Sequence, residues 1–166
     1  MPAVCAGILL FNIATGDLRQ GLSELATHDA RLSVVRSAAA VLAPDGVFVC
    51  TTHDPTARLR LIDGAWHHVG NFFRADGSLI QLELRGSYDE AARVVTGQQR
   101  VTIVGDSGDK SQMLLDLRFS LPSLDEVVGL ARAAGLRLTS LYGDYDGGDY
   151  DEGSSSFIIA TLAKAT

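Results

Sequence analysis

The sequence predicts an α/β fold in which an antiparallel β segment is inserted into an open sheet. Apolar runs at residues 3–11 and 47–51 have the unbroken pattern of buried strands, and helical periodicity separates them. Residues 64–121, in contrast, contain turn signals and alternating strands but no helical pattern. We therefore interpret the 166 residues as a single domain, with an α/β core at 1–63 and 122–166 and a β insertion at 64–121.

The composition limits the class of protein. The formal net charge of −6, without a cluster of Lys or Arg, argues against a nucleic-acid partner. No stretch has the uncharged length that spans a bilayer, and the apolar start lacks a basic region before it. We expect a cytoplasmic protein with no membrane partner. Cys5 and Cys50 lie in separate apolar runs without metal-binding spacing, so we expect buried, reduced thiols and no metal site.

The first part of the core reads as strand, helices and strand. The run at 3–11 is typical of a strand covered on both faces. Helices are predicted at about 18–26 and 30–42, and Pro44 stops the second. Residues 47–51 form the next buried strand. A strand, a crossover and a second strand predict two adjacent parallel strands.

The insertion and the chain's end follow different patterns. Four strands separated by turns are predicted at 66–73, 78–88, 93–105 and 112–121, and together form a small antiparallel sheet with one wet face. Pro122 and Ser123 then start a helix that runs to Ala134, with Gly135 after its end. The final two strands, 136–142 and 157–163, flank an acidic, glycine-rich loop.

Five stretches in this order resemble the C-terminal half of class I S-adenosylmethionine-dependent methyltransferases. The resemblance is strongest to the small-molecule branch that includes sugar-amine N-methyltransferases. The stretches are ILLFNIAT (8–15), VLAPDGVFVCTTHDP (41–55), RVVTGQQRVTI (93–103), LRFSLPSLDEVVGLARAAGLRL (117–138) and LYGDYDG (141–147).

The resemblance implies a truncated Rossmann-like methyltransferase sheet of about four strands with a four-stranded antiparallel β insertion. The family's first three strands have no counterpart in this sequence. The glycine-rich loop and the acidic residue that bind S-adenosylmethionine in the family belong to these missing strands. We therefore expect weak or no cofactor binding by the isolated chain.

The resemblance and the strand ends together suggest candidate site residues. Asn12 follows the first strand, where the family places a polar residue near the cofactor; it would also suit a turn cap. His53 follows the second strand and is our candidate general base, with Asp54 beside it as a substrate contact or a turn former.

Three further residues are candidate substrate contacts. Trp66 begins the insertion, which in the resembling family covers the acceptor pocket or makes a dimer contact; packing on the sheet is the alternative. Arg85 would bind an anionic acceptor group or pair with a neighbouring strand. Tyr142 would wall an acceptor site or pack in the core.

Residues 3–11 would form a bare apolar edge beside the missing strands. Such an edge invites pairing, so we expect a homo-oligomer or a heteromer through this strand. A refolded edge or a shortened gene product are the alternatives. The function indicated is the acceptor-side half of a methyltransferase acting on a small-molecule acceptor. A non-catalytic assembly subunit and a repurposed, cofactor-independent enzyme of small-molecule biosynthesis remain alternatives.

Overall fold

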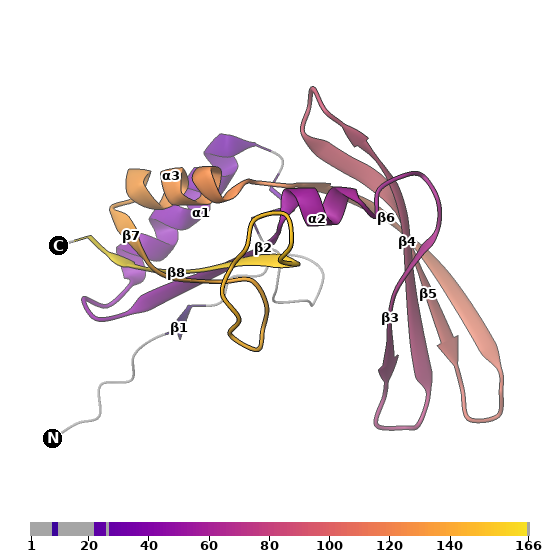
Figure 1. Cartoon of the computed structure of the whole chain (residues 1–166). Helices are drawn as coiled ribbons and strands as arrows, with labels where there is room; N and C mark the ends of the chain where they lie inside the picture. Colours follow the sequence, from indigo (N-terminus) through magenta and orange to yellow (C-terminus); the bar gives the residue numbers. More distant parts are fainter. Residues whose placement is uncertain (1–7, 10–21, 26, 166) are drawn as a thin grey trace, which may run out of the picture. The chain divides into compact units, whose positions relative to one another are not determined.

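The elements occur in the order that the sequence pattern predicts, with one short helix added. The computed structural model describes residues 8–9, 22–25 and 27–165 (Figure 1). Its elements are β1 (Ile8–Leu9), α1 (His28–Val41), β2 (Val47–His53), α2 (Pro55–Leu59), β3 (His67–Phe73), β4 (Leu79–Asp89), β5 (Val94–Val104), β6 (Lys110–Ser120), α3 (Leu124–Ala133), β7 (Leu136–Tyr142) and β8 (Phe157–Lys164).

The chain divides into two compact units. We call Met1–Arg58 with Ser120–Thr166 the core unit and Leu59–Phe119 the insertion unit. The core unit contains the sheet β1-β2-β8-β7, and the insertion unit's strands belong to the sheet β3-β4-β5-β6. The result is a mixed α/β fold with two sheets.

The core sheet combines one parallel and two antiparallel pairings. β1 runs parallel to β2, with Ile8 opposite Val47, which confirms the predicted parallel neighbours for the described part of residues 3–11. β8 lies between β2 and β7 and is antiparallel to both. Among the described strands, β1 therefore stands at one end of the sheet and β7 at the other.

The two longer helices of the core unit, α1 and α3, begin at side-chain caps. Thr27 accepts a hydrogen bond from the Ala30 amide at the start of α1. At α3, the Ser123 side chain accepts from the Glu126 amide while the Glu126 carboxylate accepts from the Ser123 amide. Gly135 follows with φ of +74°, a left-handed conformation in which glycine ends helices without strain. The ends predicted for the helix that starts at Pro122 and Ser123 and runs to Ala134 are confirmed by α3.

The helix predicted at 18–26 is wrong where the structure describes it. Residues 22–24 form a turn, and the rest of the predicted span lies outside the described residues, apart from Leu25. The Ser23 carbonyl accepts from the Ser120 amide at 2.6 Å, and the Leu25 carbonyl accepts from the Arg31 side chain at 2.7 Å. Because tertiary partners occupy these carbonyls, helical periodicity does not decide the local structure.

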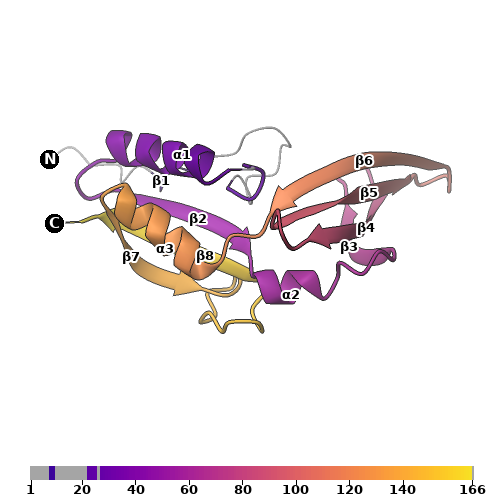
Figure 2. The same cartoon turned by 90° about the horizontal axis from the view of Figure 1, so that it is seen from above.

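One face of the core sheet carries the hydrophobic core. Figure 2 shows α1 and α3 lying on the same side of this sheet. Phe48 and Cys50 of β2 are buried, whereas Val47 and Val49 are only half-buried. The buried strand predicted at 47–51 is therefore buried on one face and half-buried on the other. The core consists of Leu22, Val35, Ala38, Leu42, Phe48, Cys50, Val127, Leu130, Ala131, Leu136, Ala160 and Leu162.

Cys50 is a free thiol in this core. It is buried, as expected, and burial raises the pKa of the thiol to about 12. The thiol therefore stays protonated near neutral pH and is a poor nucleophile. Cys5 lies outside the described residues. Among the helices that are described, none has both the length and the apolar character of a membrane crossing.

The insertion sheet has one polar and one apolar face. Register places Glu83 opposite Arg100 on the polar face and Leu82 opposite Val101 on the apolar face. Gly86 faces Gly97, and a Cβ on Gly97 would clash with the Arg85 carbonyl oxygen. Glycine at this position therefore allows the two strands to approach closely.

Helix α2 is the element that the sequence did not predict. Its five residues are too few for a visible period, and the Asp54-Pro55 pair reads equally as a turn. In the structure Asp54 accepts from the Ala57 amide at 2.8 Å, and Pro55 occupies the first helical position. The same pair therefore starts a short helix directly after β2.

Two valines on α1 provide a matched test of this core. Val35 is 1% exposed and Val41 is 70% exposed. Val35→Ala should lower the free energy of unfolding by about 2 kcal/mol, because it removes buried methyl groups and leaves a cavity. Val41→Ala should change it little, since alanine is the better helix former at an exposed position. Urea unfolding of both variants measures the difference, and equal losses would contradict the assignment of the buried face.

Candidate functional site

The carboxyl end of β2 places His53 among aromatic side chains. His53 pairs in register with Phe157, the first residue of β8. Their rings stack at a centroid distance of 5.1 Å and an interplanar angle of 23°. Tyr145, from the loop that precedes β8, packs against Phe157 with a ring-centroid distance of 5.0 Å and an interplanar angle of 60°. The imidazole therefore belongs to an aromatic cluster at a strand end.

The surroundings of His53 favour the neutral imidazole. The residue is 7% exposed, and burial is the main cause that lowers its pKa to about 4. The positive charge of Arg58 lowers the pKa further, while a hydrogen bond with the Ser156 backbone acts in the opposite direction. At neutral pH this imidazole can form hydrogen bonds, but it is a weak proton acceptor.

Asp54 is buried and joined to two segments of the chain. Its Oδ1 accepts from the Ala57 amide, and its Oδ2 accepts from the Tyr150 hydroxyl at 2.7 Å and the Gly153 amide at 3.2 Å. Burial acts to raise the pKa of this carboxyl. The hydrogen bonds from Ala57, Tyr150, Gly153 and Thr56 outweigh burial and hold the pKa below its ordinary value. The carboxylate thus fastens the loop before β8 to the end of β2.

The loop between β7 and β8 is also held by its own backbone. The Gly143 amide donates to the Gly148 carbonyl at 2.8 Å, and the Gly143 carbonyl accepts from the Phe157 amide at 3.1 Å. The Asp144 carboxylate accepts from the amides of Asp146 and Gly148. This acidic loop is therefore a set of turns, and within the described residues no group of His, Cys, Asp or Glu is arranged to hold a metal ion.

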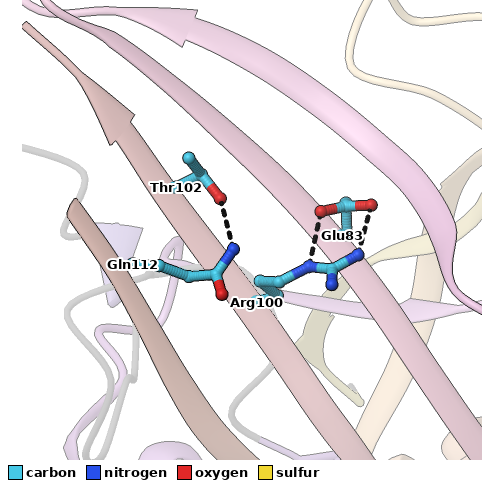
Figure 3. Close-up of polar contacts among 4 residues, drawn as sticks. All are labelled: Glu83, Arg100, Thr102 and Gln112. Atoms are coloured by element: carbon cyan, nitrogen blue, oxygen red, sulfur yellow. Dashed lines mark hydrogen bonds and ion pairs between the residues drawn. The ribbon is translucent and has the colours of Figure 1, made fainter. Parts of the chain in front are cut away.

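Trp66 and Arg85 come together in the insertion unit. The Arg85 Cζ lies 4.8 Å from the centroid of the Trp66 ring, and the Arg100 Cζ lies 4.2 Å from it. Arg85 also donates to the Gln98 side chain. Figure 3 shows Arg100 in a two-bonded pair with Glu83, at 2.6 and 2.7 Å. Both arginines therefore have partners on the polar face of this sheet.

Of the two remaining candidates, Tyr142 and Asn12, the structure describes Tyr142. Tyr142 ends β7 at the rim of the core sheet, is 36% exposed and forms a bridge with Asp149. Asn12 lies outside the described residues.

The structure brings His53 and Asp54 together with residues that sequence reasoning did not select. Phe157, Tyr150 and Arg58 all shape this strand end, yet they are spread over more than half of the chain. The sequence feature that points to these three residues is the Asp54-Pro55 pair. A helix start after a buried strand places its cap residue where distant donors can converge.

Asp54 is not free to act as the ribose-binding carboxylate of a Rossmann-type site for S-adenosylmethionine. A Rossmann-type site needs a glycine-rich turn and a carboxylate free to accept from the ribose hydroxyls. Asp54 follows a core strand, but its oxygens are occupied by the loop and by α2. The strand end can instead offer a neutral imidazole, aromatic faces and an orienting hydrogen bond to a small molecule.

The chain is similar in fold to several solved structures of methyltransferases. The chain matches the CcbJ methyltransferase from Streptomyces caelestis with 19% identity and a TM-score of 0.66, over 88% of this chain and 58% of that one. It matches CalS10, an amino pentose methyltransferase from Micromonospora echinaspora, with 21% identity and a TM-score of 0.57, over 86% and 54%. A third match is a S-adenosylmethionine-dependent methyltransferase from Clostridium acetobutylicum, with 8% identity and a TM-score of 0.64, over 93% and 62%.

These matches show a methyltransferase-like fold. The chain spans between 54% and 62% of the length of the three structures. No protein-family model matches the chain, and no curated protein matches it by sequence.

Removing the Tyr150 hydroxyl tests the link between Asp54 and the loop. Tyr150→Phe removes one hydrogen bond to Asp54 Oδ2 and leaves the bond from the Gly153 amide, so the free energy of unfolding should fall by about 1–2 kcal/mol. Hydrogen exchange of the amides at 143–156 should quicken. Tyr142→Phe is the control, because the Tyr142 hydroxyl makes no hydrogen bond in the part of the chain described. If both variants behaved alike, Tyr150 would not fasten the loop.

The low pKa of His53 links its protonation to stability. The ordinary histidine pKa is 6.5 and the folded value is about 4, so between these values the unfolded chain binds a proton that the folded chain does not. The contribution of the neutral His53 to the free energy of unfolding is therefore fully present above pH 6.5. It is lost as the pH falls toward 4, and the loss is on the order of 3 kcal/mol at most. Urea unfolding at pH 7, 6, 5 and 4.5 measures this loss. His53→Gln should flatten the profile, and an unchanged profile would refute the assignment.

Proposed function

We propose that this chain is the acceptor-side half of a small-molecule S-adenosylmethionine-dependent methyltransferase that needs an oligomer or a partner chain for activity. The observation that carries the proposal is the fold match, which covers 88% of this chain and 58% of the CcbJ methyltransferase. The core sheet would then be a truncated Rossmann-like sheet, and the β3-β4-β5-β6 sheet its insertion.

The residues at the end of β2 support a role in holding the acceptor. Methyl transfer needs the acceptor in line with the donor, in a pocket that keeps it unprotonated. S-adenosylmethionine supplies an electrophilic methyl group when it is bound. In our proposal the neutral His53 accepts a hydrogen bond from the acceptor, and Tyr142 lines the same rim. Asp54 supports them by holding the neighbouring loop.

The insertion unit carries two further candidate contacts for the acceptor. Trp66 offers an aromatic face, and Arg85 a positive charge whose side chain is exposed. In the proposal these two contact the acceptor, and Asn12 contacts the cofactor.

A partner would provide the cofactor site. The chain spans only part of the matched methyltransferases, and in our proposal the partner supplies the glycine-rich loop that holds S-adenosylmethionine. Among the described strands, β1 stands at an end of the core sheet, where another strand could pair with it. We therefore propose a homo-oligomer or a heteromer through residues 3–11.

A non-catalytic assembly subunit is the second candidate function. The observation that favours it is the exposed apolar face of the insertion sheet. Gln112 bonds to Thr102 on the polar face (Figure 3), so the alternating residues Met113 and Leu115 lie on the opposite face. These two are 52% and 40% exposed, and Phe72 on β3 is 53% exposed. Apolar side chains gathered in this way mark binding surfaces.

Titration calorimetry with S-adenosylmethionine and S-adenosylhomocysteine tests the proposal. The mass of the protein in solution is measured first by sedimentation equilibrium over a range of concentrations. We expect weak or no binding by a monomer and saturable binding by the assembled form. His53→Gln in that form should lower methyl transfer to a supplied amine without weakening cofactor binding.

Two results would contradict the proposal. A stable oligomer that binds neither compound would exclude a self-sufficient methyltransferase and favour the assembly subunit. A monomer that binds the cofactor tightly would show that no partner is needed.

A further inference from the structure

Arg31 is a buried cation of α1 that no described carboxylate neutralises. The residue is 8% exposed and lies in the first half of the helix. It forms no ion pair within the described residues. A guanidinium remains charged at any pH at which the protein is folded. Burying such a charge without a counter-ion is costly, so the site favours an anion.

The guanidinium is held in one orientation by two hydrogen bonds from the same nitrogen. Nη1 donates to the Leu25 carbonyl at 2.7 Å and to the Ser120 hydroxyl at 2.8 Å. Nε is buried and has no hydrogen-bond partner among the described residues. In the planar guanidinium, Nε and Nη2 form the edge that binds an oxyanion with two parallel bonds. The described contacts of Arg31 therefore leave Nε without an acceptor.

Buried hydroxyl groups fix the position of Ser120. Its hydroxyl donates to the Ser23 carbonyl at 3.0 Å while accepting from Arg31. The Ser23 hydroxyl in turn bonds to the Thr52 hydroxyl at 2.8 Å, and both residues are fully buried. Thr52 lies in β2, next to His53. The network thus connects Arg31 to the carboxyl end of a core strand, where α/β sheets bind ligands.

The N-terminal end of α1 adds a favourable field. Arg31 is the fourth residue of this 14-residue helix, and the positive end of a helix dipole attracts anions. The acidic residue of the first turn, Asp29, has an exposed side chain. The helix end and the orphaned Nε are separate observations that indicate the same kind of ligand.

We propose that Arg31, held by Ser120 and Leu25, is a binding site for the carboxylate or phosphate group of a small molecule. The group accepts two hydrogen bonds from the Nε–Nη2 edge and neutralises the buried charge. This inference does not rest on the proposed methyltransferase function, because it needs neither the cofactor nor a partner chain.

The test follows the Arg31 Nε–H signal by nitrogen-15 NMR during titration. The probes are sodium phosphate and sodium acetate, with sodium chloride added to keep the ionic strength constant. A saturable shift of this signal is expected with at least one probe, and the comparison of the two distinguishes phosphate from carboxylate recognition. The wild-type chain is sufficient for this measurement, so it does not depend on a variant that folds.

Two variants then distinguish binding by the two-bonded guanidinium edge from binding by the positive charge alone. Arg31→Lys keeps the charge but loses the two-bonded edge, so the probe's dissociation constant should rise about tenfold or more. Arg36→Lys is the matched control on the same helix, since Arg36 has an exposed side chain, and it should bind as the wild type does.

The outcomes separate this site from the proposed function. No saturable shift with either probe would overturn the anion site, as would an Arg31→Lys variant that binds the probe with the wild-type dissociation constant, measured in both proteins from the backbone amide signals of α1. Calorimetry with S-adenosylmethionine is a separate measurement, so a chain that fails to bind the cofactor but binds phosphate or acetate would retain the Arg31 site.

Discussion

The placement of β8 between β2 and β7 is the interaction on which the core unit depends. This strand comes from the end of the chain, yet it occupies the middle of the described sheet and pairs on both sides. Ala160 and Leu162 contribute to the core, to which residues of α1 and α3 also belong. The same register sets Phe157 opposite His53, so the strand that completes the sheet also builds the aromatic cluster.

Local chemistry explains why much of the fold could be predicted. The capping box at Ser123 and the left-handed Gly135 define α3 from neighbouring residues alone, and β7 has the bounds that the sequence pattern predicts. α2 escaped prediction because five residues carry no period. The turn at 22–24 escaped because the Ser23 carbonyl bonds to Ser120, which lies 97 residues later in the chain.

The candidate site was less predictable for the same reason. His53 and Asp54 follow a buried strand, a position that sequence reasoning can recognise. The partners of the Asp54 Oδ2 atom are Tyr150 and Gly153, which lie 96 and 99 residues later in the chain. No spacing rule connects residues so far apart, and only the fold shows that this carboxylate is already occupied.

The chain leaves the core unit after Arg58 and returns to it at Ser120. Both crossing points are fixed by backbone hydrogen bonds inside the core unit. The Arg58 amide donates to the Asp54 carbonyl at 2.9 Å, and the Ser120 amide donates to the Ser23 carbonyl at 2.6 Å. Both ends of the excursion are therefore anchored within the core unit. We expect a change in the length of the 59–119 segment between these two anchors to leave the pairing of β2, β8 and β7 intact.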